Sequence, residues 1–330
     1  MKVLLIKMSS MGDVLHTLPA VTDACENLPG IRFDWVVEED FAEIPAWHSG
    51  VDQVIPVALR RWRRQPLRHL VGPEWSAFRR RLQATRYQAV IDAQGLIKSA
   101  VICRLVDAPR FGMDRQSARE QLAAWAYDRR FPIAKNMHAV ERLRELFAHA
   151  LHYPMPAHRG SYALKPLTQA PSASNAPGLV FCHGSARVEK LWPEDNWIQL
   201  ASLAAVSGLG IYLPWGTDEE HARAQRIAAQ TDNVTVLARQ NLAELATLFS
   251  GSIGVVAVDT GLGHLAAALS VPTVSLYGPT NRRLIGAYGE HQVHLEAPLP
   301  GTTDSDAEAL MKGITPESAW HELQAVMRAA

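Results

Sequence analysis

Short apolar runs alternate with longer amphipathic segments along most of the chain, and the alternation is clearest after residue 178. Continuous runs rich in β-branched and other apolar residues, such as Leu179 to Cys182, Ile211 to Leu213 and Val255 to Val258, are typical of strands buried on both faces. The segments between the runs have helical periodicity. This alternation predicts a doubly wound parallel sheet.

The first half follows the same pattern less regularly. It contains strand-like runs at 2–7, 32–37, 53–57 and 87–92, and helical patterns at 14–27, after Gln94, from Ser117, and from His138 onward. Residues 165–178 are rich in Pro, Ser and Ala and have no apolar period, which indicates a linker. The last segment, 316–329, is an amphipathic helix that could pack on either domain. Two Rossmann-like domains are therefore expected.

Residues 254–280 predict a phosphate site, because a buried strand is followed by a sharp polar loop and then a helix. The backbone N–H groups of Thr260 to His264 would be the free donors of that helix start, which attract phosphate oxygens. Two alternatives stay open. Asp259 and Thr260 could form a helix cap, and 261–266 fits the dinucleotide fingerprint G-x-G-x-x-A. The acidic residue which that fingerprint needs is replaced by Tyr277-Gly278-Pro279.

Two further polar loops also follow predicted strands. Residues 8–13 precede a helix, and Asp13 there is either a ligand-binding carboxylate or simply the helix N-cap, while Ser9 and Ser10 also fit turn chemistry. Residues 183–193 form the second loop, in which Lys190 could be an ordinary surface partner of Glu189. Glu220 lies three residues after Thr217, a spacing that predicts a capping box.

Charge divides the chain into two halves of opposite sign. Residues 1–165 carry 24 Lys and Arg against 17 Asp and Glu, whereas 166–330 carry 9 against 16. Nine arginines and one acid lie between residues 60 and 86, and the tight group at 60–64 predicts an anion site, since guanidinium groups suit carboxylates and phosphates. Lys98, in a helix's first turn, either faces solvent or holds an anion. A nucleic-acid-binding surface is the alternative, but a pI of about 7.2 argues against a dedicated one.

Composition excludes several other classes. Three cysteines in apolar settings suggest buried thiols in a reducing compartment. The chain lacks a signal-peptide core and any run of 18 or more apolar residues, so membrane contact is expected to be peripheral. It also lacks a Walker loop, a Cys/His metal spacing and a G-x-S-x-G motif.

Many ordered motifs together resemble glycosyltransferase family 9, the ADP-heptose transferases. They include KVLLIKMSSMGDVLHTLPA, VIPVALRRWRR, AVIDAQGLIKSA, HAVERLRELF, VDTGLGHLAAAL and YGPT, and they span nearly the whole chain. The resemblance implies a GT-B fold, in which two Rossmann-like domains face each other across a cleft. It further implies an acceptor domain at 1–165 with helix 316–330 packed back on it, and a donor domain at 166–315.

The activity implied is inverting, metal-independent transfer of L-glycero-D-manno-heptose from ADP-heptose to the first Kdo of Kdo-lipid A. The enzyme would work at the cytoplasmic face of the inner membrane, with no cofactor and no nucleic-acid partner. Matched position by position, the resemblance implies that Asp13 is the catalytic base. It also implies that Lys190 is a cation that acts in catalysis and binds the donor. The other donor residues are Ser185, Glu220, Asp259, Thr260, Gly261 and His264, and the acceptor residues are Ser10, Arg60, Arg61, Arg63, Arg64, Lys98, Arg119 and His138.

One departure from the family pattern is Ala186, where relatives tend to carry a second hydroxyl residue after Ser185. Two other functions remain open at this point. A second heptosyltransferase would act on the heptosylated core, and a sugar-nucleotide epimerase of the same architecture would need the donor site alone.

Overall fold

The computed structural model describes residues 1–63, 72–164, 178–296 and 311–330, and the chain divides into two compact units, Met1–Lys165 and Pro166–Ala330. Arg64, one of the predicted acceptor residues, lies outside the described residues. Within the described part, no helix is long and apolar enough to cross a membrane.

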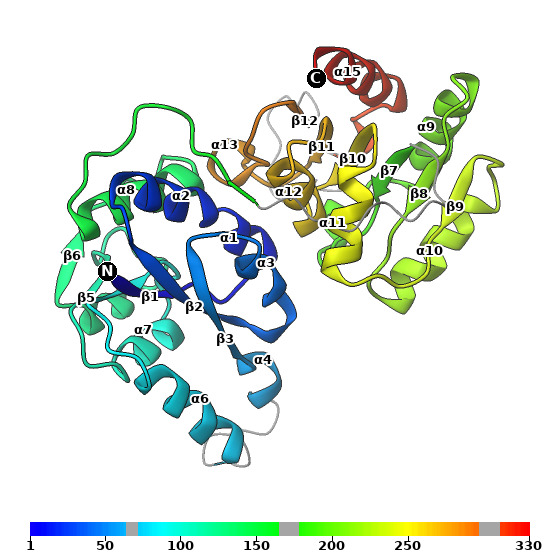
Figure 1. Ribbon diagram of the computed structural model, residues 1–330. Helices are drawn as coiled ribbons and strands as arrows, with labels where there is room; N and C mark the ends of the chain where they lie inside the picture. Colours follow the sequence, from blue (N-terminus) through cyan, green and yellow to red (C-terminus); the bar gives the residue numbers. More distant parts are fainter. Residues whose placement is uncertain (64–71, 165–177, 297–310) are drawn as a thin grey trace. The chain divides into compact units, whose positions relative to one another are not determined.

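The first unit is built on a six-stranded parallel sheet whose strand order is β3-β2-β1-β4-β5-β6 (Figure 1). Its strands are β1 (Lys2–Ile6), β2 (Arg32–Glu38), β3 (Val51–Val57), β4 (Ala89–Asp92), β5 (Arg110–Met113) and β6 (Arg129–Phe131). This is the strand order of a Rossmann domain. The chain crosses from one half of the sheet to the other between β1 and β4, so ligands are expected beyond the carboxyl ends of these two strands.

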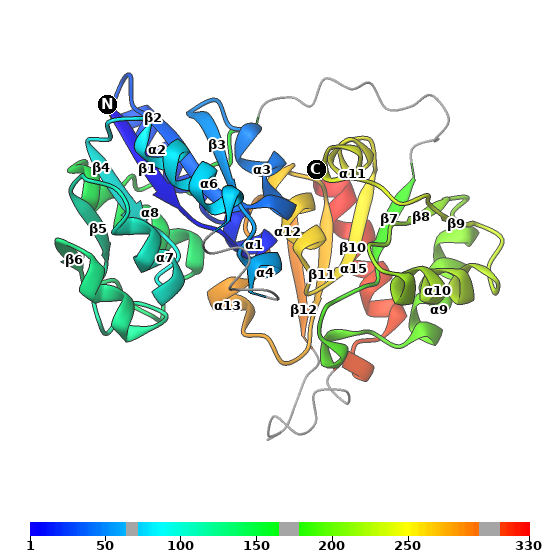
Figure 2. The ribbon, with the colours of Figure 1, turned by 90° about the horizontal axis from the view of Figure 1, so that it is seen from below.

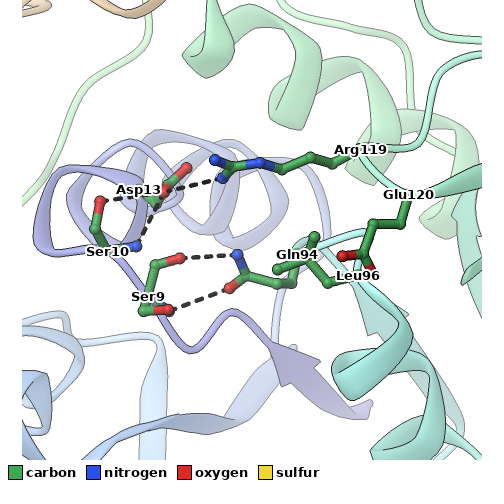
Figure 3. A pocket seen from close by; sticks show the side chains of 7 residues that line it. All are labelled: Ser9, Ser10, Asp13, Gln94, Leu96, Arg119 and Glu120. Atoms are coloured by element: carbon green, nitrogen blue, oxygen red, sulfur yellow. Dashed lines mark hydrogen bonds and ion pairs between the residues drawn. The ribbon is translucent and has the colours of Figure 1, made fainter. Parts of the chain in front are cut away.

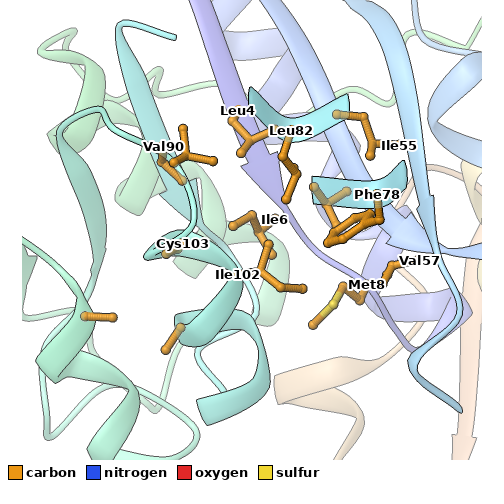
Figure 4. Close-up of a cluster of buried hydrophobic side chains, with 14 of the residues drawn as sticks. Leu4, Ile6, Met8, Ile55, Val57, Phe78, Leu82, Val90, Ile102 and Cys103 are labelled. Atoms are coloured by element: carbon orange, nitrogen blue, oxygen red, sulfur yellow. The ribbon is translucent and has the colours of Figure 1, made fainter. Parts of the chain in front are cut away.

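Helices cover both faces of this sheet. They are α1 (Met11–Leu15), α2 (Leu18–Asn27), α3 (Glu43–Ala46), α4 (Leu59–Trp62), α6 (Pro73–Gln83), α7 (Ile97–Cys103) and α8 (Ala139–Leu151), with short 3-10 helices η1 (Glu39–Phe41) and η2 (Gln121–Ala126). Leu4 and Ile6, two apart on β1, point to one face and join a buried cluster with Phe78 and Leu82 of α6 and Ile102 of α7 (Figure 4). On the opposite face, α8 packs on β2 through the rings of Phe147 and Phe33, whose centroids are 5.9 Å apart.

The second unit repeats the plan, with parallel strands in the order β12-β11-β10-β7-β8-β9. Its strands are β7 (Leu179–Cys182), β8 (Ile211–Leu213), β9 (Val234–Val236), β10 (Gly254–Val258), β11 (Thr273–Tyr277) and β12 (Gln292–Glu296). Its helices are η3 (Val188–Lys190), α9 (Glu194–Val206), α10 (Asp218–Ala228), α11 (Leu242–Ser250), α12 (Gly261–Ala268), α13 (Arg282–Ile285) and α15 (Pro316–Ala329). β7 and β10 are the counterparts of β1 and β4. The α/β class and the two doubly wound parallel sheets are therefore confirmed.

The last helix, α15, was expected on the first unit, and this expectation is wrong. Its apolar stripe of Ala319, Leu323 and Val326 is buried in the core of the second unit, with residues of α9, β10 and β11. Figure 2 shows α15 behind β10 and β11. A periodic apolar stripe indicates that one face of the helix is buried but does not identify the surface that covers this face.

Three local expectations also differ from the structure. The helix predicted at 14–27 is two helices, because Pro19 at the second position of α2 starts a new helix after Thr17. The segment from Ser117 forms the short 3-10 helix η2 and not an α-helix. The short strands β5, β6 and β12 were not predicted; β6 has exposed polar residues that carry little strand signal.

Candidate active site

The loop after β1 brings Asp13 to the carboxyl edge of the first sheet. Helix α1 begins at Met11 with Ser10 as its N-cap, so Asp13 occupies the third helical position and is not the N-cap itself. Its carboxylate Oδ2 accepts hydrogen bonds from the Ser10 backbone N–H at 2.9 Å and the Ser10 hydroxyl at 3.2 Å. The carboxylate thus supports the start of the helix and remains 28% exposed.

Lys7 holds Asp13 in its charged form. The Lys7 Nζ lies 3.2 Å from Asp13 Oδ1 and also donates to the carbonyl of Ala93 at 3.0 Å. Burial by itself raises the pKa of Asp13, but the charge of Lys7 and the Ser10 N–H outweigh it and lower the pKa from 3.8 to about 2. Asp13 is therefore a carboxylate throughout the neutral range and is ready to accept a proton.

A cavity of about 360 Å³ opens beside Asp13 (Figure 3). Gln94, from the loop after β4, accepts the backbone N–H groups of Met8 and Ser9 and donates to the Ser9 carbonyl, and so ties the two loops together. Arg119 approaches Asp13 Oδ2 to 3.9 Å with a side chain that is 68% exposed. The residues that line the cavity are Ser9, Ser10, Asp13, Gln94, Leu96, Arg119 and Glu120.

Two arginines of the group at 60–64 have acidic partners within the protein. Arg61 bonds Glu39 through Nε and Nη2, and Glu74 through Nη1. Arg60 lies 3.6 Å from Asp40. The prediction of an anion site at 60–64 did not take account of these acids, because Glu39, Asp40 and Glu74 belong to other segments and approach the arginines only in the folded chain.

A smaller cationic group nevertheless gathers around Lys98, on α7. The pKa of Lys98 is lowered by partial burial and by the charges of Arg60, Arg63 and Arg119, against the opposing effect of Glu38. Four cations that repel one another bind an anion well, because the anion relieves the repulsion. The structure thus brings together four of the predicted acceptor residues at the edge of the sheet that carries Asp13.

His138 has a structural role of its own. It is the N-cap of α8, where its Nδ1 accepts the backbone N–H of Val140 at 3.2 Å. Its ring lies 5.3 Å from that of His16, which follows α1 directly. His138 therefore packs against the residue that follows α1, the helix that carries Asp13. It does not line the cavity.

In the second unit, the predicted phosphate loop forms the start of α12. Thr260 is the N-cap and Gly261 the first helical residue. A Cβ at Gly263 would lie 3.1 Å from Ala257 Cβ, so glycine lets the helix pack closely on β10. The first N–H groups of a helix have no partner within it and, together with the helix dipole, favour an anion here.

Asp259 is the buried centre of a partly buried polar cluster at this loop. Its Oδ2 accepts from Lys190 Nζ at 2.5 Å and from the Thr280 hydroxyl at 2.5 Å, and its side chain is 7% exposed. The Ser185 hydroxyl donates to the Asp259 carbonyl at 3.3 Å. Lys190 is thus not the surface partner of Glu189 that the sequence allowed; Glu189 pairs instead with Arg187. The loops after β7 and β10 meet here.

Glu220 has a capping role and also lies beside the loop after β7. The predicted capping box is confirmed, because Glu220 Oε2 accepts the Thr217 N–H and the Thr217 hydroxyl accepts the Glu220 N–H. A Cβ at Gly184 would clash with the Glu220 carboxyl group, so that group lies directly against the loop after β7.

Two histidines complete this part of the second unit. His264 is 8% exposed, and its Nε2 lies 4.0 Å from Asp259 Oδ1. His183 is fully buried at the end of β7, and burial lowers its pKa to about 4, so its ring is neutral at physiological pH. His183 directly follows β7 and His264 lies in the first turn of α12, so each belongs to one of the two loops that meet at Asp259.

Sequence reasoning missed Lys7, Gln94 and Thr280. Lys7 and Gln94 lie at the carboxyl ends of β1 and β4, and their position next to a crossover loop was a usable signal. Thr280 ends the YGPT motif that follows β11, but the motif by itself assigned no role to its hydroxyl group.

Among the described residues, one group has ligands close enough for a metal ion: Asp23, Glu26 and His158. Asp23 is already bonded to Arg144 at 2.6 Å, and the group lies outside both candidate loops.

Comparisons with known proteins agree on one family. Glycosyltransferase family 9 (heptosyltransferase) matches residues 75–315. The chain is 54% identical to lipopolysaccharide heptosyltransferase 1 of Pseudomonas aeruginosa over 301 residues, which cover 91% of this chain and 85% of that protein.

Two solved structures are similar along the whole chain. The E. coli heptosyltransferase WaaC with ADP is 47% identical with a TM-score of 0.91, covering 99% of this chain and 100% of that one. The same enzyme with ADP-2-deoxy-2-fluoro heptose is 45% identical with a TM-score of 0.88, and both chains are covered completely.

Proposed function

The chain belongs to glycosyltransferase family 9, the heptosyltransferases, and we propose that it transfers L-glycero-D-manno-heptose from ADP-heptose to the first Kdo of Kdo-lipid A. It is a glycosyltransferase of lipopolysaccharide inner-core biosynthesis, with the GT-B class of fold. The observation that supports the assignment of roles is the pair of polar clusters, one at the crossover point of each sheet. One cluster presents a charged carboxylate and the other a phosphate loop with a partly buried lysine.

Asp13 is the proposed general base. The acceptor hydroxyl oxygen attacks C1 of heptose, its proton passes to Asp13, and the electron pair of the C1–O bond leaves with ADP. Attack from the face opposite to ADP inverts the configuration at C1. A carboxylate of low pKa is a weak base, but the acidity of the attacking hydroxyl rises as its new bond forms, so late proton transfer to Asp13 is favourable.

The donor is held by the second unit. The start of α12 and Lys190 offer positive charge to the pyrophosphate, and the charge that develops on ADP is stabilised by Lys190 without requiring a metal ion. Lys190 must then exchange part of its contact with Asp259 for phosphate oxygens. Ser185 and Glu220 border the same loop.

The cationic group around Lys98 binds the carboxylate of Kdo and the phosphate of the acceptor. Its members Arg60, Arg63 and Arg119 supply the forked donors that suit such anions. Because the acceptor is anchored in a membrane, the protein works in peripheral contact with the cytoplasmic face of the inner membrane.

Incubation of the purified protein with ADP-heptose and Kdo-lipid A tests this function. We expect release of ADP and a mass gain of one heptose on the acceptor. Hydrogen exchange with ADP alone is the second arm, and it should protect Thr260 to His264 more than Ser9 to Asp13. Conversion of the sugar nucleotide without transfer would instead indicate an epimerase, and transfer only to an already heptosylated core would indicate a second heptosyltransferase.

A further inference from the structure

Four large apolar side chains of the first unit remain exposed on two neighbouring elements. Ile97 and Val101 on α7 are 42% and 44% exposed, and Leu122 and Trp125 on η2 are 62% and 52% exposed. Residues four apart on an α-helix share one face, as do residues three apart on a 3-10 helix. α7 and η2 pack against each other, so these four exposed side chains stand on adjoining elements, and we call them the apolar patch.

Basic side chains accompany the apolar patch. The Arg104 guanidinium lies 5.7 Å from the centre of the Trp125 ring and connects α7 to η2 at that side. Between residues 97 and 130 the chain has seven Lys and Arg against four Asp and Glu. Arg110 pairs with Asp128, which leaves six basic residues against three acids. Exposed tryptophan and leucine beside arginine is the composition expected at a membrane interface.

The apolar patch and the Asp13 cavity share a rim. Leu96 and Glu120 line the cavity. Leu96 directly precedes Ile97, and Glu120 lies two residues before Leu122. The Glu120 bond to Ile97 fixes η2 to the start of α7, so the cavity mouth and the patch form one continuous structure. A bilayer that covered the patch would therefore lie next to the cavity.

We propose that Ile97, Val101, Leu122 and Trp125, with Arg104 beside them, insert into the interfacial layer of an anionic lipid bilayer and hold the Asp13 cavity at the membrane surface. The apolar side chains supply burial in the headgroup region, and the arginine supplies attraction to anionic lipids. The inference rests on the proposed function in one respect, because an acceptor anchored in lipid is the reason to hold the Asp13 cavity at the membrane surface.

Co-sedimentation with vesicles tests the proposal without any substrate. The probes are vesicles of phosphatidylethanolamine and phosphatidylglycerol in equal parts, compared with vesicles of phosphatidylcholine alone. We expect the wild-type chain to bind the anionic vesicles. The double variant Leu122→Gln/Trp125→Gln should bind them at least about tenfold more weakly, because each apolar side chain that enters the interface contributes on that scale.

Two further variants separate the apolar and electrostatic parts. Arg104→Gln should weaken binding to anionic vesicles about fivefold and leave binding to neutral ones unchanged. Val206→Gln is the matched control, because Val206 is 90% exposed at the end of α9 in the other unit and its loss should change nothing.

Activity distinguishes this proposal from the proposed function. With a delipidated, water-soluble Kdo acceptor the double variant should transfer heptose as fast as wild type, and with Kdo-lipid A in vesicles it should be slower. Vesicle binding without transfer to either acceptor would refute the proposed function and would still support the membrane role of the apolar patch. Equal vesicle binding by the wild type and the double variant would refute the membrane role of the apolar patch. A wild type that binds no vesicles but forms a dimer, which the double variant does not form, would refute it as well.

Discussion

Replacing Lys7 with methionine should raise the pKa of Asp13 and so change the pH dependence of the reaction. At 3.2 Å and an effective dielectric constant near 20, the Lys7–Asp13 attraction is about 5 kcal/mol. The net lowering of the pKa from 3.8 to about 2 corresponds to about 2.5 kcal/mol, because burial of the carboxylate opposes Lys7. Without Lys7 the burial effect remains, so the pKa should rise to about 4 or higher.

The same change affects stability with a definite sign. A carboxyl whose pKa is lowered by folding stabilises the protein above its unfolded value of 3.8, and this contribution is lost as pH falls through about 2. Lys7→Met should therefore lose about 2 kcal/mol of the free energy of unfolding at neutral pH, which urea unfolding measures. Methionine keeps the length of the side chain, so turnover near pH 8 should stay within about tenfold of wild type.

The assay is the pH profile of kcat/KM between about pH 4 and 9, supported by a carbon-13 NMR titration of the Asp13 carboxyl. Wild type should show no decline that reflects Asp13 in this range, whereas Lys7→Met should decline on the acid side. Lys2→Met is the control, because Lys2 pairs with Asp34 and Asp52 at the other end of the same strand. Identical profiles for wild type and Lys7→Met would refute the role assigned to Lys7.

Three further results are expected. Lys190→Ala should lower kcat about a hundredfold or more, since a nearby charge stabilises the departing ADP by several kcal/mol; near-normal turnover, or full rescue by magnesium alone, would count against it. Thr280→Val removes one of the hydrogen bonds to Asp259 and should weaken ADP binding about tenfold by calorimetry, and unchanged affinity would exclude Thr280 from the donor site. Arg60→Gln/Arg63→Gln should raise the acceptor KM and leave ADP binding as it is, whereas the reverse pattern would assign these arginines to the donor.

The fold class was predictable because the central strands of both sheets are continuous apolar runs separated by helical segments, whereas edge strands such as β6 and β12 are not. Leu179–Cys182 and Ile211–Leu213 have the predicted bounds, since a strand buried on both faces is a continuous apolar run. The final helix was placed on the first unit by the family resemblance, since its pattern alone left both units open. Its stripe of Ala319, Leu323 and Val326 fits any apolar surface, and only the complete second sheet determines where it packs.

Parts of the site followed from local spacing and parts did not. The Thr217–Glu220 capping box depends on residues three apart, which a sequence displays directly. The Lys190–Asp259 pair joins residues 69 apart, so its burial arises only when the loops after β7 and β10 meet. The acids that neutralise Arg61 were overlooked for the same reason.

The most direct test of the account compares Asp13→Asn with Lys7→Met for kcat and free energy of unfolding at the same neutral pH. Both variants break the same ion pair and should lose a similar amount of stability, but only the first removes the base. The account predicts that kcat falls by about 10² to 10⁴ in Asp13→Asn, with ADP-heptose still bound, and stays within about tenfold of wild type in Lys7→Met. Equal kcat in the two variants, or activity in Asp13→Asn that declines only as far as the protein unfolds, would contradict it and leave Asp13 as a support for the start of α1.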